Sequence, residues 1–188
     1  MGKRLTKVVT RTGDGGTTGM ADGSRCSKND ARVHCLGEID ELNANLGVVL
    51  SLLDDGPIQS LIFSVQHDLF DIGAEICQPG KALIGEDYVA ALEQSVEAYN
   101  SELPPLKEFI LPGGSPPVAA LQLARTVCRR AERGLVALDA EQEVNPHTRQ
   151  YVNRLSDLLF ILGRALAHQE GNGEVYWNSK FSRLSRDD

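Results

Sequence analysis

Residues 10–19 combine glycines, threonine hydroxyls and one arginine, in the order Thr-Arg-Thr-Gly-Asp-Gly-Gly-Thr-Thr-Gly, and Lys28 follows them. Closely spaced glycines allow several backbone N–H groups to point to one place, while hydroxyls and cations add donors and positive charge. Such a segment suits a polyphosphate. It lacks the Gly-x-x-x-x-Gly-Lys-Ser/Thr spacing of a Walker loop, and an arm of turns without any ligand is the alternative.

A second cluster places four arginines within residues 125–133 of one predicted helix. Arg125, Arg129 and Glu132 are spaced four and three apart, so they share a face. Because like charges one turn apart destabilise a helix, this cluster favours a buried or anionic partner. A solvated face with weak Arg–Glu pairs remains open.

Two further groups are weaker signals. Asn153 and Asp157 lie one turn apart on another predicted helix, where an amide and a carboxylate could bind sugar hydroxyls or an adenine edge. Asp40 and Glu41 flank the apolar stripe of the first helix. Each group could equally be ordinary polar surface, since Asn, Asp and Glu are mostly exposed in proteins.

The elements that must position these groups are helices, because apolar residues recur at steps of three and four in five segments. The first runs from an Asp30 N-cap to a break at 54–57, and the others cover about 58–76, 86–102, 116–138 and 146–170. We therefore expect an all-α fold, a five-helix up-and-down bundle. It forms a single domain over 1–188, with an arm at 1–29, the bundle at about 30–170 and a tail at 171–188. A short extended piece is expected at 7–10, and we expect Val175, Tyr176 and Trp177 to anchor the tail.

Composition and missing motifs exclude several classes of protein. The chain has 19 Lys and Arg against 26 Asp and Glu, a net charge of −7, which argues against a general nucleic-acid binder. The first 32 residues differ from the rest, because they hold seven basic and three acidic residues and so carry a net positive charge. The four cysteines form no Cys-x-x-Cys pair, which disfavours a zinc site or disulfide scaffold. No apolar run has the length of a signal peptide or membrane span, so we expect a soluble, cytoplasmic protein.

Catalytic motifs of other helical and hydrolytic enzymes are also missing. No histidine has a glutamate three residues before it, as a di-iron bundle requires. Neither His-Glu-x-x-His nor Gly-x-Ser-x-Gly occurs, so metalloprotease and α/β-hydrolase functions have no support.

Six blocks, taken in order, resemble the propanediol-utilisation type of ATP:cob(I)alamin adenosyltransferase. They are residues 10–18, 27–30, 37–43, 109–114, 129–133 and 153–157, and the resemblance extends over about 7–168. It implies a five-helix bundle of ferritin-like architecture that forms a homotrimer with active sites between subunits. It also implies that the cobalt of cob(I)alamin attacks C5′ of ATP and gives adenosylcobalamin and triphosphate. Since cobalt is then the nucleophile, the protein needs no nucleophilic side chain of its own.

The resemblance assigns roles to individual residues. The arm would bind the ATP phosphates and ribose through Thr10, Arg11, Thr12, Gly13, Thr18, Gly19 and Lys28. The helical cluster would complete that site through Arg129, Arg130, Glu132 and Arg133, with Glu132 holding Mg²⁺ or orienting the arginines, and Asn153 would contact the nucleoside.

Besides Arg129, which is also assigned a catalytic role, four residues would bind the corrinoid or take part in catalysis. Arg125 would face Asp40 of the adjacent subunit, with Asp157 in support. Phe109 would pack below the corrin and displace its lower axial ligand, which makes four-coordinate Co(II) easier to reduce. A reductase would supply cob(I)alamin and an adenosylcobalamin-dependent enzyme would receive the product, with no nucleic-acid or membrane partner.

Two departures from the family pattern concern phosphate binding. Gly15 stands where many relatives have a lysine, and residues 20–24 lack the usual bulky Leu-Phe. Two other functions stay open: a noncatalytic carrier of a corrinoid or nucleotide, and a helical interaction module whose arginines meet an acidic partner.

Overall fold

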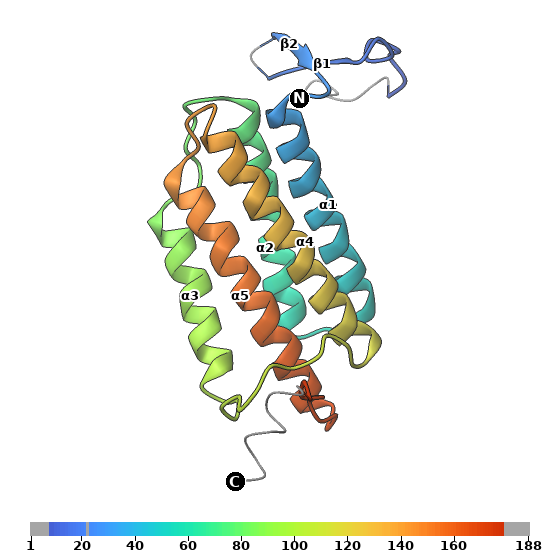
Figure 1. Cartoon of the computed structure of the whole chain (residues 1–188), viewed down its shortest axis with the longest axis vertical. Coiled ribbons are helices and arrows are strands. Elements are labelled where there is room, and N and C mark those ends of the chain that lie inside the picture. Colours follow the sequence, from blue (N-terminus) through green and yellow to red (C-terminus); the bar gives the residue numbers. More distant parts are fainter. Residues whose placement is uncertain (1–7, 22, 179–188) are drawn as a thin grey trace.

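The computed structural model describes residues 8–21 and 23–178, and within them five helices run up and down one long axis (Figure 1). The helices are α1 (Ala31–Leu52), α2 (Pro57–Cys77), α3 (Glu86–Asn100), α4 (Pro116–Asp139) and α5 (Pro146–Gln169). This arrangement confirms the predicted all-α five-helix bundle, and each helix lies within a few residues of its expected range. None of the helices in the described ranges is long and apolar enough to cross a membrane.

Local sequence signals set the starts of the helices. Asp30 caps α1 by accepting a hydrogen bond from the backbone N–H of Arg32 at 2.9 Å, and Asn145 caps α5 in the same way. Three helices, α2, α4 and α5, begin with proline, whose fixed φ and missing N–H suit the first turn.

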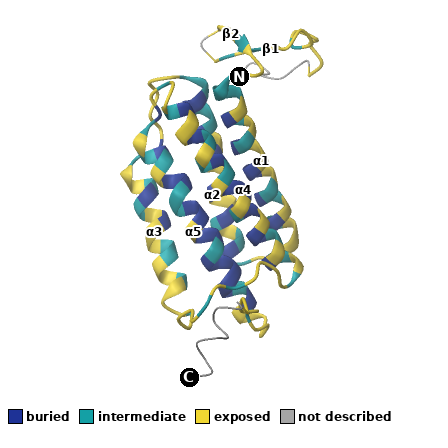
Figure 2. Ribbon diagram, in the orientation of Figure 1, coloured by how far each residue is buried: buried dark blue, intermediate teal, exposed yellow. Residues whose placement is uncertain are grey.

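The helices pack in the spatial order α2, α1, α4, α5 and α3, with α1 against α2 and α4, and α5 against α4 and α3. Buried residues line the inward faces of all five (Figure 2). The central side chains include Leu42, Leu46, Ile62, Leu155 and Tyr151, all almost wholly buried. The Tyr151 hydroxyl donates to Asp68 on α2 at 2.6 Å, which joins α5 to α2 across the core.

The arm contains a short antiparallel hairpin that the sequence did not predict. Its strands are β1 (Thr17–Gly19) and β2 (Arg25–Ser27), paired with Thr18 opposite Cys26. The expected extended piece at 7–10 is wrong for residues 8–10, which form no strand, and Lys7 lies outside the described residues. Lys3, Arg4 and Asp22, which contribute to the charge balance of the arm, also lie outside them.

The tail returns to the loop between α3 and α4. Ile110 and Tyr176 form an antiparallel bridge, which confirms the predicted anchoring role of residues 175–177. Residues 179–188 of the expected tail lie outside the described part of the chain.

Candidate functional site

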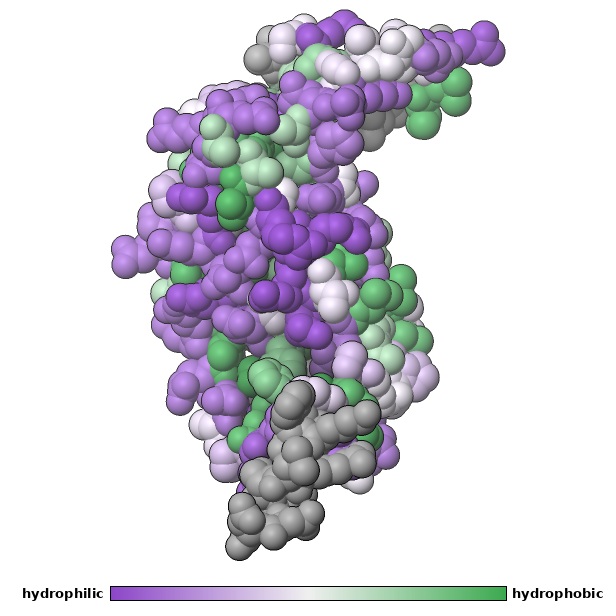
Figure 3. All heavy atoms as spheres, viewed as in Figure 1, coloured by the Kyte–Doolittle hydropathy of each residue, from purple (hydrophilic) through white to green (hydrophobic). Residues whose placement is uncertain are grey.

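The predicted residues of α4 and α5 form one polar face. Arg125, Arg129 and Glu132 follow each other along α4, and Asn153 lies beside them on α5. The Asn153 side-chain amide donates to Glu132 at 2.8 Å, so the two predicted motifs meet. In Figure 3 hydrophilic side chains gather over the middle of the face that α4 and α5 present in this view.

Asn153 is held from two sides. Its carbonyl oxygen accepts from Arg154 at 2.7 Å, and Arg154 also donates to Glu93 on α3 at 2.7 Å. The amide therefore has a fixed orientation, with a polar chain running from α3 through α5 to Glu132 on α4. The sequence analysis did not predict this role of Arg154, although the residue lies within the block 153–157.

Arg125 is positioned by a residue that the sequence did not single out. Its Nε atom donates at 2.9 Å to the side-chain oxygen of Gln122, which is only 5% exposed. Burial, and then the nearby charge of Arg129, lower the pKa of Arg125. A desolvated guanidinium beside a second one favours an anionic partner.

The other arginines of the cluster differ in their partners. Arg130 forms an ion pair with Glu41 on α1, and Arg133 donates to the backbone carbonyl of Arg129 at 3.0 Å. Within the described ranges, the exposed guanidinium of Arg129 makes no hydrogen bond or ion pair. The structure thus commits Arg130 to a contact between helices and leaves Arg129 available to a ligand.

The arm has a defined internal structure. The Arg25 guanidinium donates to the backbone oxygens of Thr12 at 2.7 Å and of Thr17 at 3.2 Å, and to the Thr17 hydroxyl at 2.8 Å. A Cβ atom on Gly13 would lie 3.1 Å from the Lys28 ammonium, so these two predicted phosphate ligands are neighbours. Arg11 adopts a φ of +60°, a conformation that L-residues rarely adopt, within this turn. Arg25 itself was not predicted as a site residue.

Arm and arginine cluster stay apart within one chain. The hairpin lies off the end of the bundle at which α1 begins, and its side chains are mostly exposed (Figures 1 and 2). Asp40 is exposed on α1 and lines a groove between α1 and α2, and among the described residues it forms no ion pair with Arg125. The structure therefore brings the α4 and α5 members of the predicted site together and places Gly13 beside Lys28 in the arm, but within the chain these two groups and Asp40 remain separate.

Phe109 lies in the loop between α3 and α4, at the end of the bundle opposite the arm (Figure 1). The residue is 75% exposed, and its ring lies 6.3 Å, centroid to centroid, from the ring of Trp177. These two aromatic side chains at the surface provide an apolar contact surface for a flat ligand.

The last predicted site residue, Asp157, is exposed one turn beyond Asn153 on α5.

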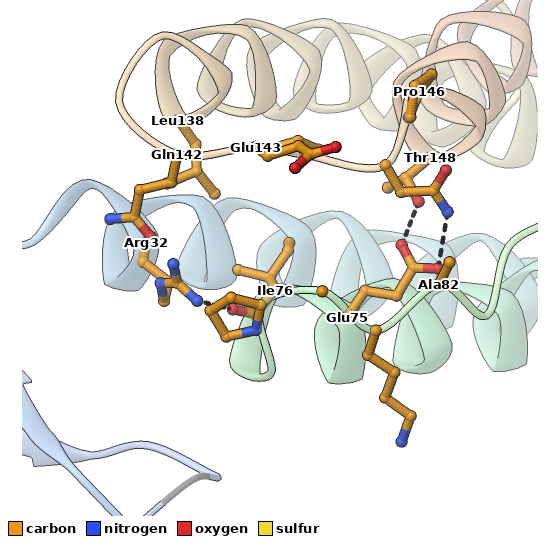
Figure 4. Close-up of a pocket in the computed structure, with 14 residues that line it drawn as sticks. Arg32, Glu75, Ile76, Ala82, Leu138, Gln142, Glu143, Pro146 and Thr148 are labelled. Atoms are coloured by element: carbon orange, nitrogen blue, oxygen red, sulfur yellow. Dashed lines mark hydrogen bonds between the residues drawn. The ribbon is translucent and has the colours of Figure 1, made fainter.

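A pocket of about 360 Å³ lies where α2 and α4 end and α5 begins, and none of the predicted site residues lines it (Figure 4). The buried Glu75 carboxylate lies beside it and accepts hydrogen bonds from the backbone N–H groups of Leu83 and Ile84 and from the side chains of Asn145 and Thr148. All these bonds are internal, so Glu75 ties α2 and the segment after it to the start of α5. Its role is structural.

Within the described ranges, no cluster of three or more His, Cys, Asp or Glu side chains could hold a metal ion. Burial raises the pKa of the Cys35 thiol to about 12 and also raises the pKa of Cys128, so neither is an activated thiolate.

Comparison with known proteins decides the family. The cobalamin adenosyltransferase family matches residues 8–166 of this chain. The chain belongs to that family. Membership confirms the resemblance inferred from the six motifs and the expected class of enzyme, a corrinoid adenosyltransferase.

Individual members of the family are similar over nearly their whole length. A cobalamin adenosyltransferase of Cupriavidus metallidurans is 50% identical over 178 residues, covering 94% of this chain and 97% of that protein. A corrinoid adenosyltransferase of Mycobacterium tuberculosis is 46% identical over 187 residues, covering 94% of this chain and 95% of that protein.

Solved structures show the same fold. A variant of the PduO-type ATP:corrinoid adenosyltransferase of Lactobacillus reuteri, complexed with cobalamin and ATP, superposes with a TM-score of 0.87 at 32% identity, covering 92% of this chain and all of that one. Another variant of that enzyme, complexed with ATP, gives a TM-score of 0.86 at 34% identity, covering 91% of this chain and 100% of that one.

Proposed function

We propose that this protein transfers the 5′-deoxyadenosyl group of ATP to the cobalt of cob(I)alamin. The electron pair of Co(I) forms the Co–C5′ bond while the C5′–O bond breaks, and triphosphate leaves with that bond's electron pair. The observation that carries the proposal is the face built from Arg125, Arg129, Glu132 and Asn153, whose exposed Arg129 guanidinium is available to an anionic leaving group. The family and the ligands of the Lactobacillus reuteri structures support it.

Holding the leaving group is the first task of the side chains. Negative charge develops on the triphosphate as the C5′–O bond breaks, and fixed cations stabilise that charge best where water is excluded. Arg129 and Arg133 from α4, with Lys28 and the glycine turn of the arm, supply such groups. Arg130 contributes by holding α4 against α1 through Glu41.

The polar pair Glu132 and Asn153, between α4 and α5, binds Mg²⁺ and the nucleoside on this proposal. Asn153 offers its remaining N–H to the nucleoside, in an orientation fixed by Arg154. Mg²⁺ in nucleotide sites is held by one or two carboxylates plus the substrate phosphates, so the single carboxylate of Glu132 fits an ion that arrives with ATP. Arg129 and Glu132, one turn apart, then flank the same phosphates.

The complete site lies between subunits of a homotrimer on this proposal. Asp40 has no arginine partner within its chain among the described residues, and Arg125 holds only Gln122 there. Pairing Asp40 with Arg125 of a neighbouring subunit satisfies both, and it brings one subunit's arm toward another's α4. Phe109 lies below the corrin and displaces its lower axial ligand, with Asp157 supporting the corrinoid side.

The proposed organisation is one domain over 1–188, in which residues 1–29 form the ATP-binding arm, about 30–170 the bundle and 171–188 the tail. We place the enzyme in the cytoplasm, where a reductase supplies the reduced corrinoid and an adenosylcobalamin-dependent enzyme takes the product.

Product formation tests the proposal. The protein is incubated anaerobically with ATP, Mg²⁺ and chemically reduced cob(I)alamin, and both adenosylcobalamin and triphosphate are quantified. We expect them in equal amounts with repeated turnover. A folded protein that binds ATP or cobalamin without forming either product is a carrier, and one whose melting temperature ATP leaves unchanged is an interaction module.

A further inference from the structure

The loop that carries Phe109 is paired with the C-terminal tail through backbone hydrogen bonds on both sides of residue 110. The Trp177 N–H donates to the Phe109 carbonyl at 2.7 Å, and the Leu111 N–H donates to the Val175 carbonyl at 2.8 Å. Ile110 and Tyr176 form the bridge between these bonds. The tail is therefore joined to the loop by backbone hydrogen bonds on either side of Ile110.

A largely buried ion pair holds the tail to the bundle. Arg164 of α5 donates to Glu174 at 2.5 Å, and the exposed fractions of the two side chains are only 3% and 15%. The same guanidinium donates to the Pro104 carbonyl at 2.8 Å. Arg164 thus connects the tail and the beginning of the α3–α4 loop to one point on α5.

A pocket of about 210 Å³ lies between the loop, the tail and the helices α4 and α5, so the loop is not packed directly against the bundle over this space. Ile110, Gly113, Gln122, Gly163 and Glu174 are among its lining residues. Without the tail, the loop could sink into this space or swing outward. The backbone bridge and the ring contact with Trp177 join Phe109 to the tail, and the Arg164–Glu174 ion pair joins the tail to α5.

We propose that Arg164 and Glu174 are positioning residues that hold Phe109 through the tail in the place where it displaces the lower axial ligand of the corrin. This inference rests on the proposed function. It assigns the two residues to generation of four-coordinate Co(II), and not to the attack of Co(I) on C5′. Their loss should therefore affect the enzyme differently with the two oxidation states of its substrate.

Glu174→Gln is the main variant, because glutamine keeps the length of the side chain and one hydrogen bond to Arg164 but removes the charge. Asp139→Asn is its matched control: it removes the carboxylate that pairs with Arg149 at 2.7 Å near the opposite end of α5. Turnover is measured with preformed cob(I)alamin and with cob(II)alamin plus a chemical reductant. The EPR spectrum of bound cob(II)alamin with ATP reports whether an axial nitrogen is coordinated.

We expect Glu174→Gln to lose about tenfold in turnover of cob(II)alamin, a loss typical of a displaced contact group. It should retain axial-nitrogen coupling in the EPR spectrum and keep its cob(I)alamin turnover within about twofold, and Asp139→Asn should match the unmodified protein in all three. Equal losses with both substrates, or an unchanged EPR spectrum, would overturn the positioning role.

Two further outcomes are separated by design. If Glu174→Gln loses its helical circular dichroism, Glu174→Asp replaces it, because aspartate keeps the charge but does not reach Arg164 as closely, and the same pattern is required of it. If the unmodified protein makes no adenosylcobalamin from cob(I)alamin, the proposed function fails. If the unmodified protein is active and the variants lose only the EPR spectrum of four-coordinate Co(II), the proposed function stands and the positioning role is supported.

Discussion

At the scale of single residues, Arg129 is distinguished by being exposed beside Arg125 and uncommitted to any internal partner within the described ranges. We expect Arg129→Ala to lower kcat with cob(I)alamin by about 10²-fold or more, since it removes a cation from the leaving group. Arg149→Ala on the same bundle is the control. If Arg129→Ala lowers the melting temperature, and the folded fraction of the variant keeps a normal kcat, then Arg129 has a structural role only.

Gln122 offers a second residue-scale prediction. Its buried side chain accepts from Arg125, so Gln122→Leu leaves the guanidinium without its internal acceptor. We expect KM for cob(I)alamin to rise about tenfold, a typical cost of one hydrogen bond to a charged group. KM for ATP should change much less. Steady-state kinetics with each substrate varied in turn measures the two effects, and a change confined to ATP would place Arg125 on the nucleotide side.

Sequence reasoning reached some of these residues and not others for a physical reason. Helical spacing alone placed Arg125, Arg129 and Glu132 on one face, because that spacing is a property of a single element. Gln122 and Arg164 escaped notice because their importance comes from partners on other segments: a buried glutamine or arginine looks like any polar residue until the helices are packed.

At the scale of elements, the joint between α2 and α5 gives a pH prediction. Burial raises the pKa of Asp68 above its ordinary value of 3.8, against the opposing hydrogen bond from Tyr151. The folded state therefore binds this proton more tightly than the unfolded state. Its stabilising contribution is fully present below the unfolded pKa and is lost as pH rises through the folded pKa.

Asp68→Asn tests this contribution, because asparagine can still accept the Tyr151 hydroxyl but does not titrate. The unfolding free energy of the original protein, compared with that of the variant, should fall as pH rises from about 3.8 through the raised pKa. Urea unfolding of both proteins between about pH 3.5 and 6 measures the difference. A difference that grows with pH would mean that the carboxylate is stabilised by folding.

The helices were predictable from sequence and the hairpin was not. The helices α1, α2, α4 and α5 repeat their apolar pattern over five or more turns and begin at Asp, Pro or Asn-Pro, so the signals accumulate. The shorter α3 follows Gly85 and has a weaker pattern. The strands of the arm are three residues each, TTG and RCS, too short to show an alternating pattern. Their pairing depends on Arg25, which reaches back to Thr12 and Thr17.

At the scale of the whole molecule, the proposed sharing of sites between subunits of a trimer predicts complementation between inactive variants. On that proposal, Asp40→Arg and Arg129→Ala each damage every site of a pure trimer, but from opposite sides of the interface. In trimers reassembled from an equal mixture, roughly a quarter of interfaces combine an intact Asp40 with an intact Arg129. We expect adenosylcobalamin formation to recover to about that fraction of normal. A mass-tagged subunit shows whether the subunits exchange. If they exchange and activity does not recover, both residues belong to the site of one subunit.

The clamp that Arg25 makes inside the arm has a thermodynamic consequence. Ordering one residue of flexible backbone costs roughly 1–2 kcal/mol in conformational entropy. Because Arg25 already joins residues 12 and 17, and Lys28 already lies over Gly13, much of that cost is met during folding and not on binding. On the proposed function, a larger part of the free energy of each phosphate contact is then retained as affinity for ATP. An arm composed so largely of glycine and threonine can thus serve as a preorganised nucleotide site.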